Sequence, residues 1–473
     1  MNINRLIYPG FWFGKTPKEE ALELAKRGVG GFCIYGGTLP QVRELIAELR
    51  AVSPLPHLFM CADYEDGLGR WIEGESWVLS NMAVGAGQNP DIAYQKGLTL
   101  AYEARKAGID WVFAPVLDLC DEPQNPIVNT RSFGEDAQQV AVLGKALCRG
   151  LKDGGVLNSI KHFPGHGRTT LDSHLTLPVL QRSLKDLQEN ELIPFASAFP
   201  VADSVMIGHL LLPQIDEKNP ASLSPAVISL LKEKMGFNKL IFTDALCMKA
   251  IGDEREAALK ALRAGAHILL SAENSLALSD FLQKQDGFQN IIAESAKLQE
   301  EAWHGLCAPA KQAFGASEFN RKYISECAVL SGEAPSFPPE TKMAYLELGN
   351  EEKLVAQSFL SALEQQGFIL KKPHEKADVL VAVSFSNFQA FKGHINLSQT
   401  EQETLCSLMI KYPRTVFVSF GSPFGTENIQ GINTRIFLFS PADEAQAYAA
   451  EILAGKQKPK GKNPFGPVEK EKS

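Results

Sequence analysis

Short apolar runs rich in Val, Ile and Phe recur along the first 270 residues and alternate with segments of helical period. This alternation is typical of β/α units around a parallel sheet. It predicts eight strands, near 6–13, 31–36, 57–63, 111–117, 156–161, 204–208, 239–243 and 266–271. Helices are expected near 17–27, 40–51, 91–107, 137–153, 184–196, 225–235 and 247–264. Eight strands favour a closed (β/α)8 barrel of the TIM type over an open, doubly wound sheet.

A second, smaller domain is predicted after the barrel. Helical periodicity continues over 274–330, and the proline-containing run from Ser331 to Glu340 predicts an exposed linker. We therefore expect a barrel domain at 1–330 and a three-layer α/β domain at 341–455, with strands near 343–348, 378–385, 415–420 and 434–439 and helices near 352–366, 399–411 and 441–454. Residues 456–473 are rich in lysine and poor in apolar side chains, so we expect a disordered tail.

Composition and charge narrow the function classes. Of the 473 residues, 45% are hydrophobic and 22% are charged, as in ordinary globular proteins. The formal net charge of −8 provides no cationic field for nucleic acid or an anionic membrane. The eight cysteines are scattered without a C-x-x-C pair, which favours reduced, buried thiols. The N-terminus has no signal-like apolar stretch, and no window of eighteen apolar residues occurs. We therefore expect a cytoplasmic protein that binds neither nucleic acid nor membranes, and the sequence carries no signal for an oligomeric state.

Candidate chemistry concentrates in one segment that follows the strand expected near 156–161. Three of the nine histidines lie within thirteen residues of one another, between Lys161 and His174. Pro164, Gly165 and Gly167 prevent a helix from starting there. The loops after the carboxyl ends of barrel strands build active sites, so this segment is the first candidate site.

Several interpretations compete for this segment. His162, His166, His174 and Asp172 are possible zinc ligands, but their spacing matches no zinc motif. A triad through Ser173 is disfavoured, because neighbouring side chains of an extended chain point to opposite sides. His166, between two glycines, is best interpreted as a structural residue of the loop. Asp172 and His174, at positions i and i+2, project from the same side and favour an acid/base dyad without metal or cofactor.

Acidic residues also end several of the predicted strands. Asp244 follows the apolar run Leu240 to Thr243, and Asp63 and Asp118 follow similar runs. A rim of carboxylates suits a polyhydroxylated ligand, because each carboxylate can accept hydrogen bonds from a pair of sugar hydroxyls. Asp244 could instead cap the helix that we expect from Cys247. Asp118, and Arg131 further along the chain, could equally be structural.

These segments resemble glycoside hydrolase family 3. The resemblance rests on the runs Lys161 to His174, Ile241 to Met248, Ala114 to Asp118 and Arg131 to Gly134, and it covers roughly residues 5 to 300. More narrowly, the runs resemble the β-N-acetylglucosaminidase branch that takes part in peptidoglycan recycling. Residues 415–423 are similar to the second domain of some members.

The resemblance implies a retaining β-N-acetylhexosaminidase that acts without a cofactor on terminal β-linked N-acetylglucosamine, with cell-wall fragments as its substrate. Asp244 would attack the anomeric carbon, and His174, paired with Asp172, would act as acid and then base. This differs from the usual pair of carboxylates in glycosidases. The implied sugar-binding residues are Asp63, Arg131, Lys161 and His162.

The sequence departs from the family pattern in one functional segment. The D-x-E-G-G-R motif of the family appears as Asp63 to Leu68, so its arginine is missing, and Arg70 is a possible replacement. Alternatives within the family are a β-glucosidase or β-xylosidase, which takes its acid from a second-domain Glu, and a phosphorylase. A zinc hydrolase and a silent sugar-binding barrel are alternatives from other classes. Because the barrel loop already contains a dyad, we expect the second domain to supply no general acid and to serve stability or partner contact.

Overall fold

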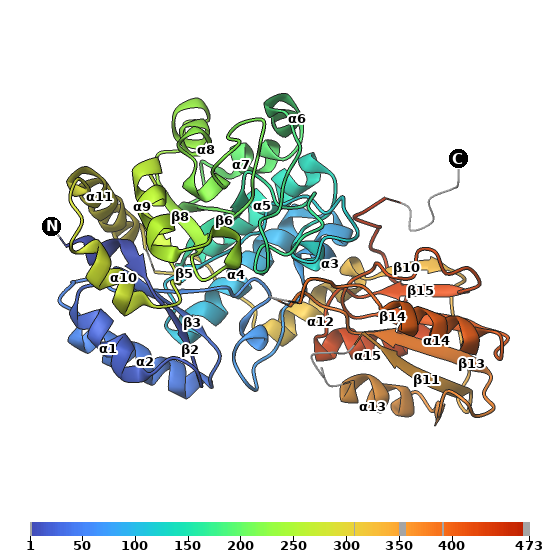
Figure 1. Ribbon diagram of the computed structural model, residues 1–473. Helices are drawn as coiled ribbons and strands as arrows, with labels where there is room; N and C mark the ends of the chain where they lie inside the picture. Colours follow the sequence, from blue (N-terminus) through green and yellow to red (C-terminus); the bar gives the residue numbers. More distant parts are fainter. Residues whose placement is uncertain (1, 307, 350–355, 390–391, 467–473) are drawn as a thin grey trace.

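The computed structural model describes residues 2–306, 308–349, 356–389 and 392–466, and it consists of a barrel beside a smaller domain (Figure 1). All neighbouring strands of the barrel pair in parallel, in the order β1-β9-β8-β7-β6-β5-β4-β3-β2. These strands are β1 (Ile7–Tyr8), β2 (Gly10–Trp12), β3 (Gly31–Tyr35), β4 (Phe59–Ala62), β5 (Trp111–Val112), β6 (Leu157–Phe163), β7 (Ser204–Ile207), β8 (Leu240–Ala245) and β9 (Ile268–Leu270).

The barrel closes through its first strand. Strand β1 pairs with β9 and β2 pairs with β3, and only Pro9 separates β1 from β2. Proline has no backbone N–H, so it interrupts the ladder without ending the extended chain. The segment from Ile7 to Trp12 therefore acts as one strand, and the prediction of an eight-stranded α/β barrel is confirmed.

Helices surround the barrel strands, and most lie where the periodicity predicted them. They are α1 (Lys18–Lys26), α2 (Leu39–Val52), α3 (Asn81–Gly87), α4 (Pro90–Ala107), α5 (Ala137–Asp153), α6 (Leu184–Glu189), α7 (Leu192–Ala198), α8 (Pro225–Ser229), α9 (Glu254–Ala264), α10 (Ser275–Leu282) and α11 (Gln289–Gly305). The helix expected over 184–196 is divided between α6 and α7 at Asn190. The helix expected from residue 247 begins only at Glu254, because the side chain of Asp253 caps its first N–H groups.

Large apolar side chains fill the interior of the barrel. Trp111 and Tyr8 are fully buried and meet the ring of Phe242 edge-on, with ring centroids 5.1 and 5.5 Å away. Cys33 and Cys61 belong to the same cluster, in agreement with the expected buried thiols. Cys406 is exposed, however, and Cys307 lies outside the described residues. The filled interior supports a site at the strand ends rather than a channel.

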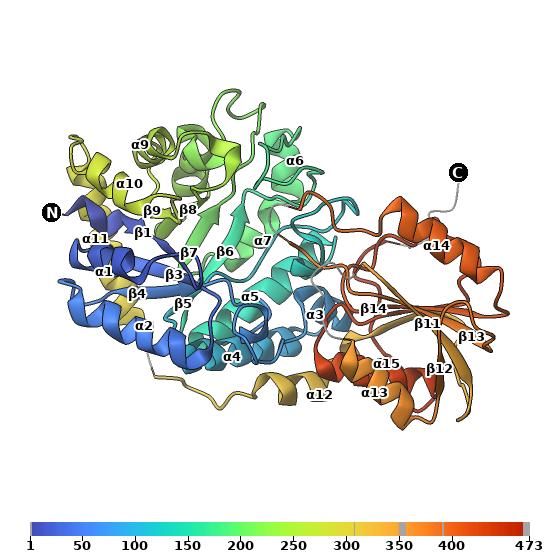
Figure 2. The ribbon, with the colours of Figure 1, turned by 60° about the horizontal axis from the view of Figure 1, so that its bottom comes forward.

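The second domain is a mixed sheet between two layers of helices. Its strands lie in the order β10-β15-β14-β13-β11-β12, and only the pair of β10 and β15 is antiparallel. They are β10 (Val329–Gly332), β11 (Lys342–Leu348), β12 (Ile369–Lys371), β13 (Val379–Ser384), β14 (Thr415–Ser419) and β15 (Thr434–Phe437). Figure 2 shows α14 (Gln399–Met409) on one face of the sheet, and α13 (Gln357–Gln365) with α15 (Asp443–Leu453) on the other.

The chain enters the second domain earlier than the sequence pattern predicted. Helix α12 (Ala316–Cys327) leads into β10, so Ser331 and Gly332 form an edge strand rather than part of an exposed linker. The backbone of Ser331 and Gly332 pairs with β15, and this pairing cannot be seen from local composition. Part of the helix expected over 352–366 lies outside the described residues, since 350–355 are not described.

The expected tail is packed against both domains as far as the structure describes it. The N–H of Lys462 donates to Ala86 O at 2.9 Å, and the N–H of Glu135 donates to Pro464 O at 3.0 Å, so the segment contacts the barrel. Phe465 is buried among aromatic side chains of the second domain, including Phe437. The prediction of disorder is therefore wrong for residues 456–466, while 467–473 lie outside the described residues.

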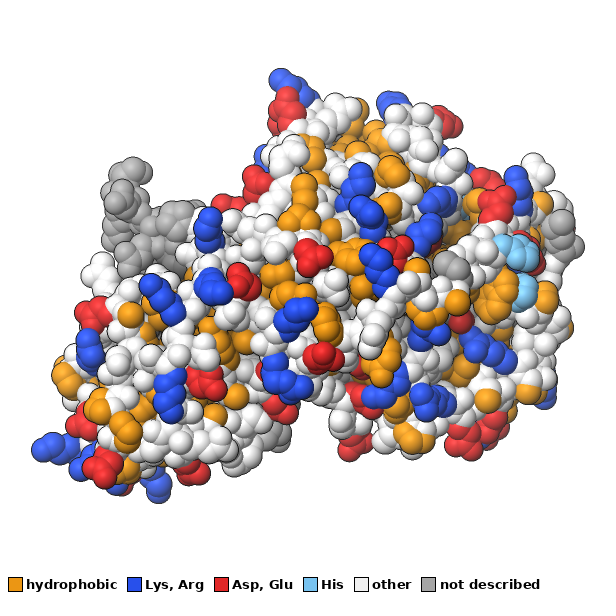
Figure 3. Space-filling view, turned by 180° about the vertical axis from the view of Figure 1, so that it is seen from behind, with side chains coloured by type: hydrophobic (Ala, Val, Ile, Leu, Met, Phe, Trp, Pro, Cys, Tyr) orange, Lys and Arg blue, Asp and Glu red, His pale blue; other side chains and the backbone are white. Residues whose placement is uncertain are grey.

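The surface of the described ranges carries both charge signs. Lysine and arginine side chains alternate with aspartate and glutamate over the face drawn in Figure 3. Within these ranges, no helix is both long enough and apolar enough to cross a bilayer.

Candidate active site

A pocket lies at the carboxyl ends of the barrel strands and brings together residues that are far apart in sequence. Six of the seven predicted site residues line it: Asp63, Arg131, Lys161, His162, His174 and Asp244. The seventh, Asp172, is buried and binds the ring of His174. Trp12, Tyr35 and Trp71 form an aromatic wall, with the rings of Trp12 and Tyr35 stacked 4.0 Å apart. Aromatic faces beside carboxylates give the pocket both apolar and hydrogen-bonding surfaces.

Asp63, directly after β4, is held by two side chains of the pocket. Lys161 Nζ lies 2.6 Å from its Oδ1, and the hydroxyl of Tyr35 donates to its Oδ2 at 3.1 Å. The indole N–H of Trp71 donates to the backbone carbonyl of Asp63 at 2.9 Å. These contacts fix the carboxylate in the pocket, where 23% of the side chain is exposed and can meet a ligand.

Glu65 is a site residue that the sequence interpretation missed, although it stands in the same D-x-E run as Asp63. Arg131 donates to it through Nε and Nη2 at 2.9 and 2.8 Å, and Lys161 Nζ lies 2.6 Å away. Burial acts to raise the pKa of Glu65, but the charges of Arg131 and Lys161 outweigh burial and hold that pKa well below its usual range. The buried acid therefore keeps both cations charged and oriented.

Glu65→Gln is expected to lower the free energy of unfolding by about 3 kcal/mol near neutral pH, because it removes the charged partner of the buried Arg131 and one of the two charged partners of the buried Lys161. The folded-state pKa of Glu65 is depressed, so this loss is fully present above the unfolded pKa of about 4.3. The loss shrinks as the pH falls toward the folded-state value. Urea denaturation of both proteins across this pH range measures the difference.

The half-buried acid Glu300, which pairs with Arg5 at 3.2 Å and has 39% of its side chain exposed, provides the control for removing one negative charge. Glu300→Gln should change the free energy of unfolding by less than about 1 kcal/mol, because water screens that pair. Equal losses from the two variants, or a Glu65→Gln loss that grows as the pH falls, would contradict the assignment.

Asp118 holds the segment that carries His162 and His166. Its carboxylate accepts the N–H groups of His162, at 3.2 Å, and His166, at 2.7 Å, and lies 2.6 Å from His162 Nδ1. Arg131 Nη2 lies 3.4 Å from His162 Nε2. Since arginine can only donate, His162 Nε2 accepts and the proton sits on Nδ1, facing Asp118. These contacts favour a structural role for Asp118. His162, by contrast, lines the pocket.

His166 is held within its own loop. Its two ring nitrogens lie 3.0 Å from Thr169 Oγ1 and 3.1 Å from Ser173 Oγ. Burial lowers the pKa of His166 to about 4, so the ring is neutral. These contacts favour the structural interpretation of His166. Among the described residues, no group of three His, Cys, Asp or Glu side chains is arranged to hold a metal ion.

Asp172 and His174 form the close pair that their i, i+2 spacing predicted. Asp172 Oδ1 accepts the backbone N–H of His174 at 2.8 Å and lies 2.8 Å from its Nδ1. Burial acts to raise the pKa of Asp172, but these hydrogen bonds outweigh it and hold the pKa below its usual value. The ionised carboxylate therefore fixes the proton of His174 on Nδ1 and sets the direction of the ring.

Asp244 is the penultimate residue of β8 and lines the pocket. The N–H of Ala245 donates to its Oδ1 at 2.8 Å. Burial acts to raise the pKa of Asp244, but His162, His209 and this N–H outweigh it and lower the pKa to about 2. Asp253 caps α9, so Asp244 does not fill the alternative role of a helix cap. An ionised carboxylate in a pocket is suited to nucleophilic attack.

The second domain also reaches the pocket, which the sequence interpretation did not predict. Phe388 lines it, and Arg70 Nη2 donates to the carbonyl of Phe388 at 2.9 Å. Arg70, a barrel residue, lines the same pocket. A guanidinium is therefore present although the arginine of the family motif is absent at Leu68. The second domain was expected to serve stability or partner contact, and the structure adds that the domain forms part of the pocket wall.

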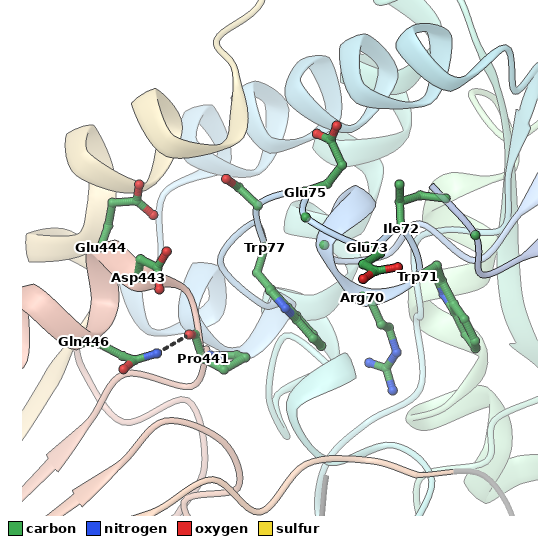
Figure 4. A pocket seen from close by; sticks show the side chains of 14 residues that line it. Arg70, Trp71, Ile72, Glu73, Glu75, Trp77, Pro441, Asp443, Glu444 and Gln446 are labelled. Atoms are coloured by element: carbon green, nitrogen blue, oxygen red, sulfur yellow. Dashed lines mark hydrogen bonds between the residues drawn. The ribbon is translucent and has the colours of Figure 1, made fainter. Parts of the chain in front are cut away.

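A groove between the domains adjoins this pocket. It runs between residues 69–77 of the barrel and 441–446 of the second domain, and it shares Arg70 and Trp71 with the pocket at the strand ends. Figure 4 shows Arg70, Trp71 and Trp77 projecting side by side, with Pro441 and Gln446 across the gap. Residues of both domains therefore line the surface next to the pocket.

Comparisons with known proteins agree with this architecture. The model of the glycosyl hydrolase family 3 N terminal domain matches residues 2–301. A β-hexosaminidase of Pseudomonas aeruginosa is 34% identical over 274 residues, which cover 55% of this chain and 81% of that protein. A β-hexosaminidase of Neisseria meningitidis is 36% identical over 273 residues, covering 54% of this chain and 74% of that protein.

Two solved structures share both domains. A family 3 β-N-acetylglucosaminidase of Paenibacillus sp. is 26% identical, with a TM-score of 0.86 over 99% of this chain and 98% of that one. A β-glucoside phosphorylase is 23% identical, with a TM-score of 0.87 over 98% of this chain and 94% of that one, and at this identity it shows the fold alone. The match over 2–301 spans more than half of the chain, and the protein is therefore a glycoside hydrolase that belongs to family 3.

Proposed function

We propose that this glycoside hydrolase is a retaining β-N-acetylhexosaminidase that releases terminal β-linked N-acetylglucosamine from cell-wall (peptidoglycan) fragments. The observation that carries the proposal is the pairing in one pocket of an ionised carboxylate, Asp244, with a carboxylate-held imidazole, His174. The names of the relatives from Pseudomonas and Neisseria support the choice of sugar.

In the first step, Asp244 attacks the anomeric carbon and the glycosidic bond breaks. His174 begins this step protonated on both ring nitrogens and gives its Nε2 proton to the departing oxygen, so the aglycone leaves as a neutral alcohol and the sugar is esterified to Asp244. In the second step, His174 takes a proton from water, the water oxygen attacks the anomeric carbon, and the Asp244 carboxylate is released. Two displacements at one carbon retain its configuration.

Asp172 makes the imidazole suitable for both steps. Its carboxylate stabilises the imidazolium that forms when His174 accepts a proton, and it keeps Nδ1 protonated throughout. An unperturbed imidazole titrates at a pKa of about 6.5, near physiological pH. Unlike a second carboxylate, it adds no negative charge close to the nucleophile.

The charged side chains opposite the dyad would hold the sugar. Asp63 is the carboxylate that remains partly exposed, and it would accept hydrogen bonds from sugar hydroxyl groups while Lys161 holds it in place. Arg131 and His162 complete this side of the pocket. Among the described residues, Phe388 is the second-domain side chain that lines the pocket, and it carries no acid. That arrangement supports a barrel dyad over the alternative of a second-domain Glu.

Hydrolysis of 4-nitrophenyl N-acetyl-β-glucosaminide is expected to exceed that of the glucoside by more than about 10²-fold in kcat/KM, since binding groups matched to one substituent discriminate strongly. A chelator should leave the rate unchanged, and phosphate should yield no sugar phosphate. Faster cleavage of the glucoside would favour the β-glucosidase alternative. Formation of N-acetylglucosamine 1-phosphate would favour the phosphorylase, and loss of activity in chelator would favour a zinc hydrolase.

A further inference from the structure

We propose that the second domain positions the acid/base dyad of the barrel through Phe388 and Gly393, and that Arg70 anchors Phe388. Phe388 and Gly393 are thus positioning residues. The inference rests on the proposed role of His174, and it goes beyond that role by assigning a catalytic purpose to the second domain.

The first contact is a hydrogen bond between the domains. The backbone N–H of Gly393 donates to Asp172 Oδ2 at 3.2 Å, while Asp172 Oδ1 receives His174. Each oxygen of the carboxylate therefore has its own donor, one from each domain. Two donors fix the plane of a carboxylate, and hydrogen bonds to its ionised form keep it charged. The ring of His174 takes its direction from this carboxylate, so Gly393 acts on the ring through Asp172.

The second contact is the ring of Phe388. Its centroid lies 4.6 Å from the guanidinium carbon of Arg131 and 6.2 Å from the ring centroid of His174. Phe388 thus stands between a residue proposed to bind the sugar and the proposed acid. An arginine over an aromatic face is held by the ring quadrupole, more strongly where water is excluded. The ring also limits the space into which His174 can turn.

A buried charge network in the barrel fixes the anchor of Phe388. Arg70 donates to the Phe388 carbonyl, and its guanidinium carbon lies 5.1 Å from the ring centroid. Its Nη1 lies 3.8 Å from Asp66, which receives the fully buried Lys96 Nζ at 3.2 Å. Lys96 also donates to Asn81 at 2.8 Å, and Asn81 donates to the carbonyl of Arg131 at 2.7 Å. The same network therefore supports Arg70 and Arg131.

The pair of Asp172 and His174 needs contacts from outside its own segment, because it lies in a loop. Residues 164–183 contain no helix or strand, so the ladder hydrogen bonds that hold Asp244 in β8 are absent around His174. A displacement of about 1 Å in a reacting group can cost about 10²-fold in rate. Contacts from the second domain supply the precision that the loop itself lacks.

Phe388→Ala in the full-length protein is expected to lower kcat/KM by about 10- to 100-fold on an unactivated disaccharide, with kcat falling more than KM rises, since the ring also lies over Arg131. The loss should be smaller for a dinitrophenyl glycoside, which needs little protonation to leave. Phe388→Tyr keeps the ring and should restore most of the activity. Phe337 is the matched control. It is half-buried in the second domain, the guanidinium carbon of Arg414 lies 5.9 Å from its ring centroid, and it does not line the pocket. Phe337→Ala should leave the leaving-group dependence unchanged.

Gly393→Ala tests the hydrogen bond without removing a side chain. Gly393 has φ +77°, and an added Cβ would lie 3.2 Å from Leu175 Cδ1, so the N–H should shift away from Asp172. We expect a loss of about 3- to 10-fold with the same leaving-group dependence. Gly367→Ala, with φ +83° and a Cβ 3.1 Å from Pro339, imposes similar strain at a residue away from the pocket and should show no such loss.

The outcomes separate this inference from the proposed function. If His174→Ala shows leaving-group dependence while Phe388→Ala and Gly393→Ala show none, the positioning role of the second domain is overturned and the function stands. If His174→Ala itself shows no leaving-group dependence, the proposed role of His174 is refuted, and with it the proposed function. Losses that are equal for all leaving groups, accompanied by a lower Tm, would identify Phe388 and Gly393 as structural residues and overturn the inference.

Discussion

Asp244→Ala is expected to reduce hydrolysis by roughly 10⁴-fold or more, the largest effect of any single substitution in this protein. The carboxylate would form the covalent bond to the sugar, and no other acid of the described pocket can replace it. Asp63 is paired with Lys161, and Glu65 is paired with Arg131. Because the pKa of Asp244 is about 2, the nucleophile stays ionised throughout the pH range in which the protein would be assayed.

A fluorinated N-acetylglucosaminyl substrate with a good leaving group should trap the glycosyl-enzyme, and mass spectrometry of its peptides should place the sugar on Asp244. Proton NMR of early product should show the β-anomer. Asp253→Ala is the control, since Asp253 lies on the same connection but caps α9. It should cost about 1 kcal/mol of stability and leave turnover unchanged. An α-anomeric product, or an adduct on another residue, would refute the assignment.

His174→Ala is expected to slow hydrolysis of an unactivated glycoside by about 10²- to 10⁴-fold, the usual contribution of a general acid. A dinitrophenolate leaves with little protonation, so its first step should be nearly unaffected. The second step still lacks a base, so the glycosyl-enzyme should accumulate. Azide needs no deprotonation and should restore turnover by forming the glycosyl azide. Steady-state and burst kinetics with and without azide measure each of these effects.

Two further variants place the His174 result in context. Asp172→Ala should show the same pattern more weakly, because the imidazole remains but loses its orientation and its stabilising charge. His57→Ala removes a half-buried imidazole that stacks on Trp303 with ring centroids 4.1 Å apart, away from the pocket, and should leave catalysis unchanged. Equal losses for all leaving groups without rescue by azide would show that His174 is not the acid.

Local sequence carried much of the information about the barrel. Strand residues alternate with helical periods over short distances, so the eight strands could be assigned without tertiary contacts. The ends of the strands were equally accessible, since Asp63 and Asp244 follow apolar runs directly. The spacing of Asp172 and His174 was sufficient to predict their contact, because two residues of an extended chain that are separated by one position face the same side.

Contacts between distant segments could not be read in this way. The sequence left a structural role open for Arg131, and its bidentate pair with Glu65, 66 residues earlier, appears only in the folded pocket. Ser331 and Gly332 resemble a linker in composition, yet they pair with β15 about a hundred residues later. The lysine-rich segment after residue 455 was expected to be disordered, but Phe465 finds an aromatic cluster. In each case the decisive partner lies far away in the chain.

The division has a physical reason. Which residues form strands, where the acids follow them and that Asp172 and His174 share one loop depend on backbone periodicity and on neighbours within a few positions, so these features are predictable from local sequence. The contacts of Phe388 and Gly393 with Arg131 and Asp172 depend on how the two domains pack against each other, so they appear only in the folded protein. The proposed nucleophile and acid are thus local features of strands and loops, while the contacts that position them across the domain interface are not.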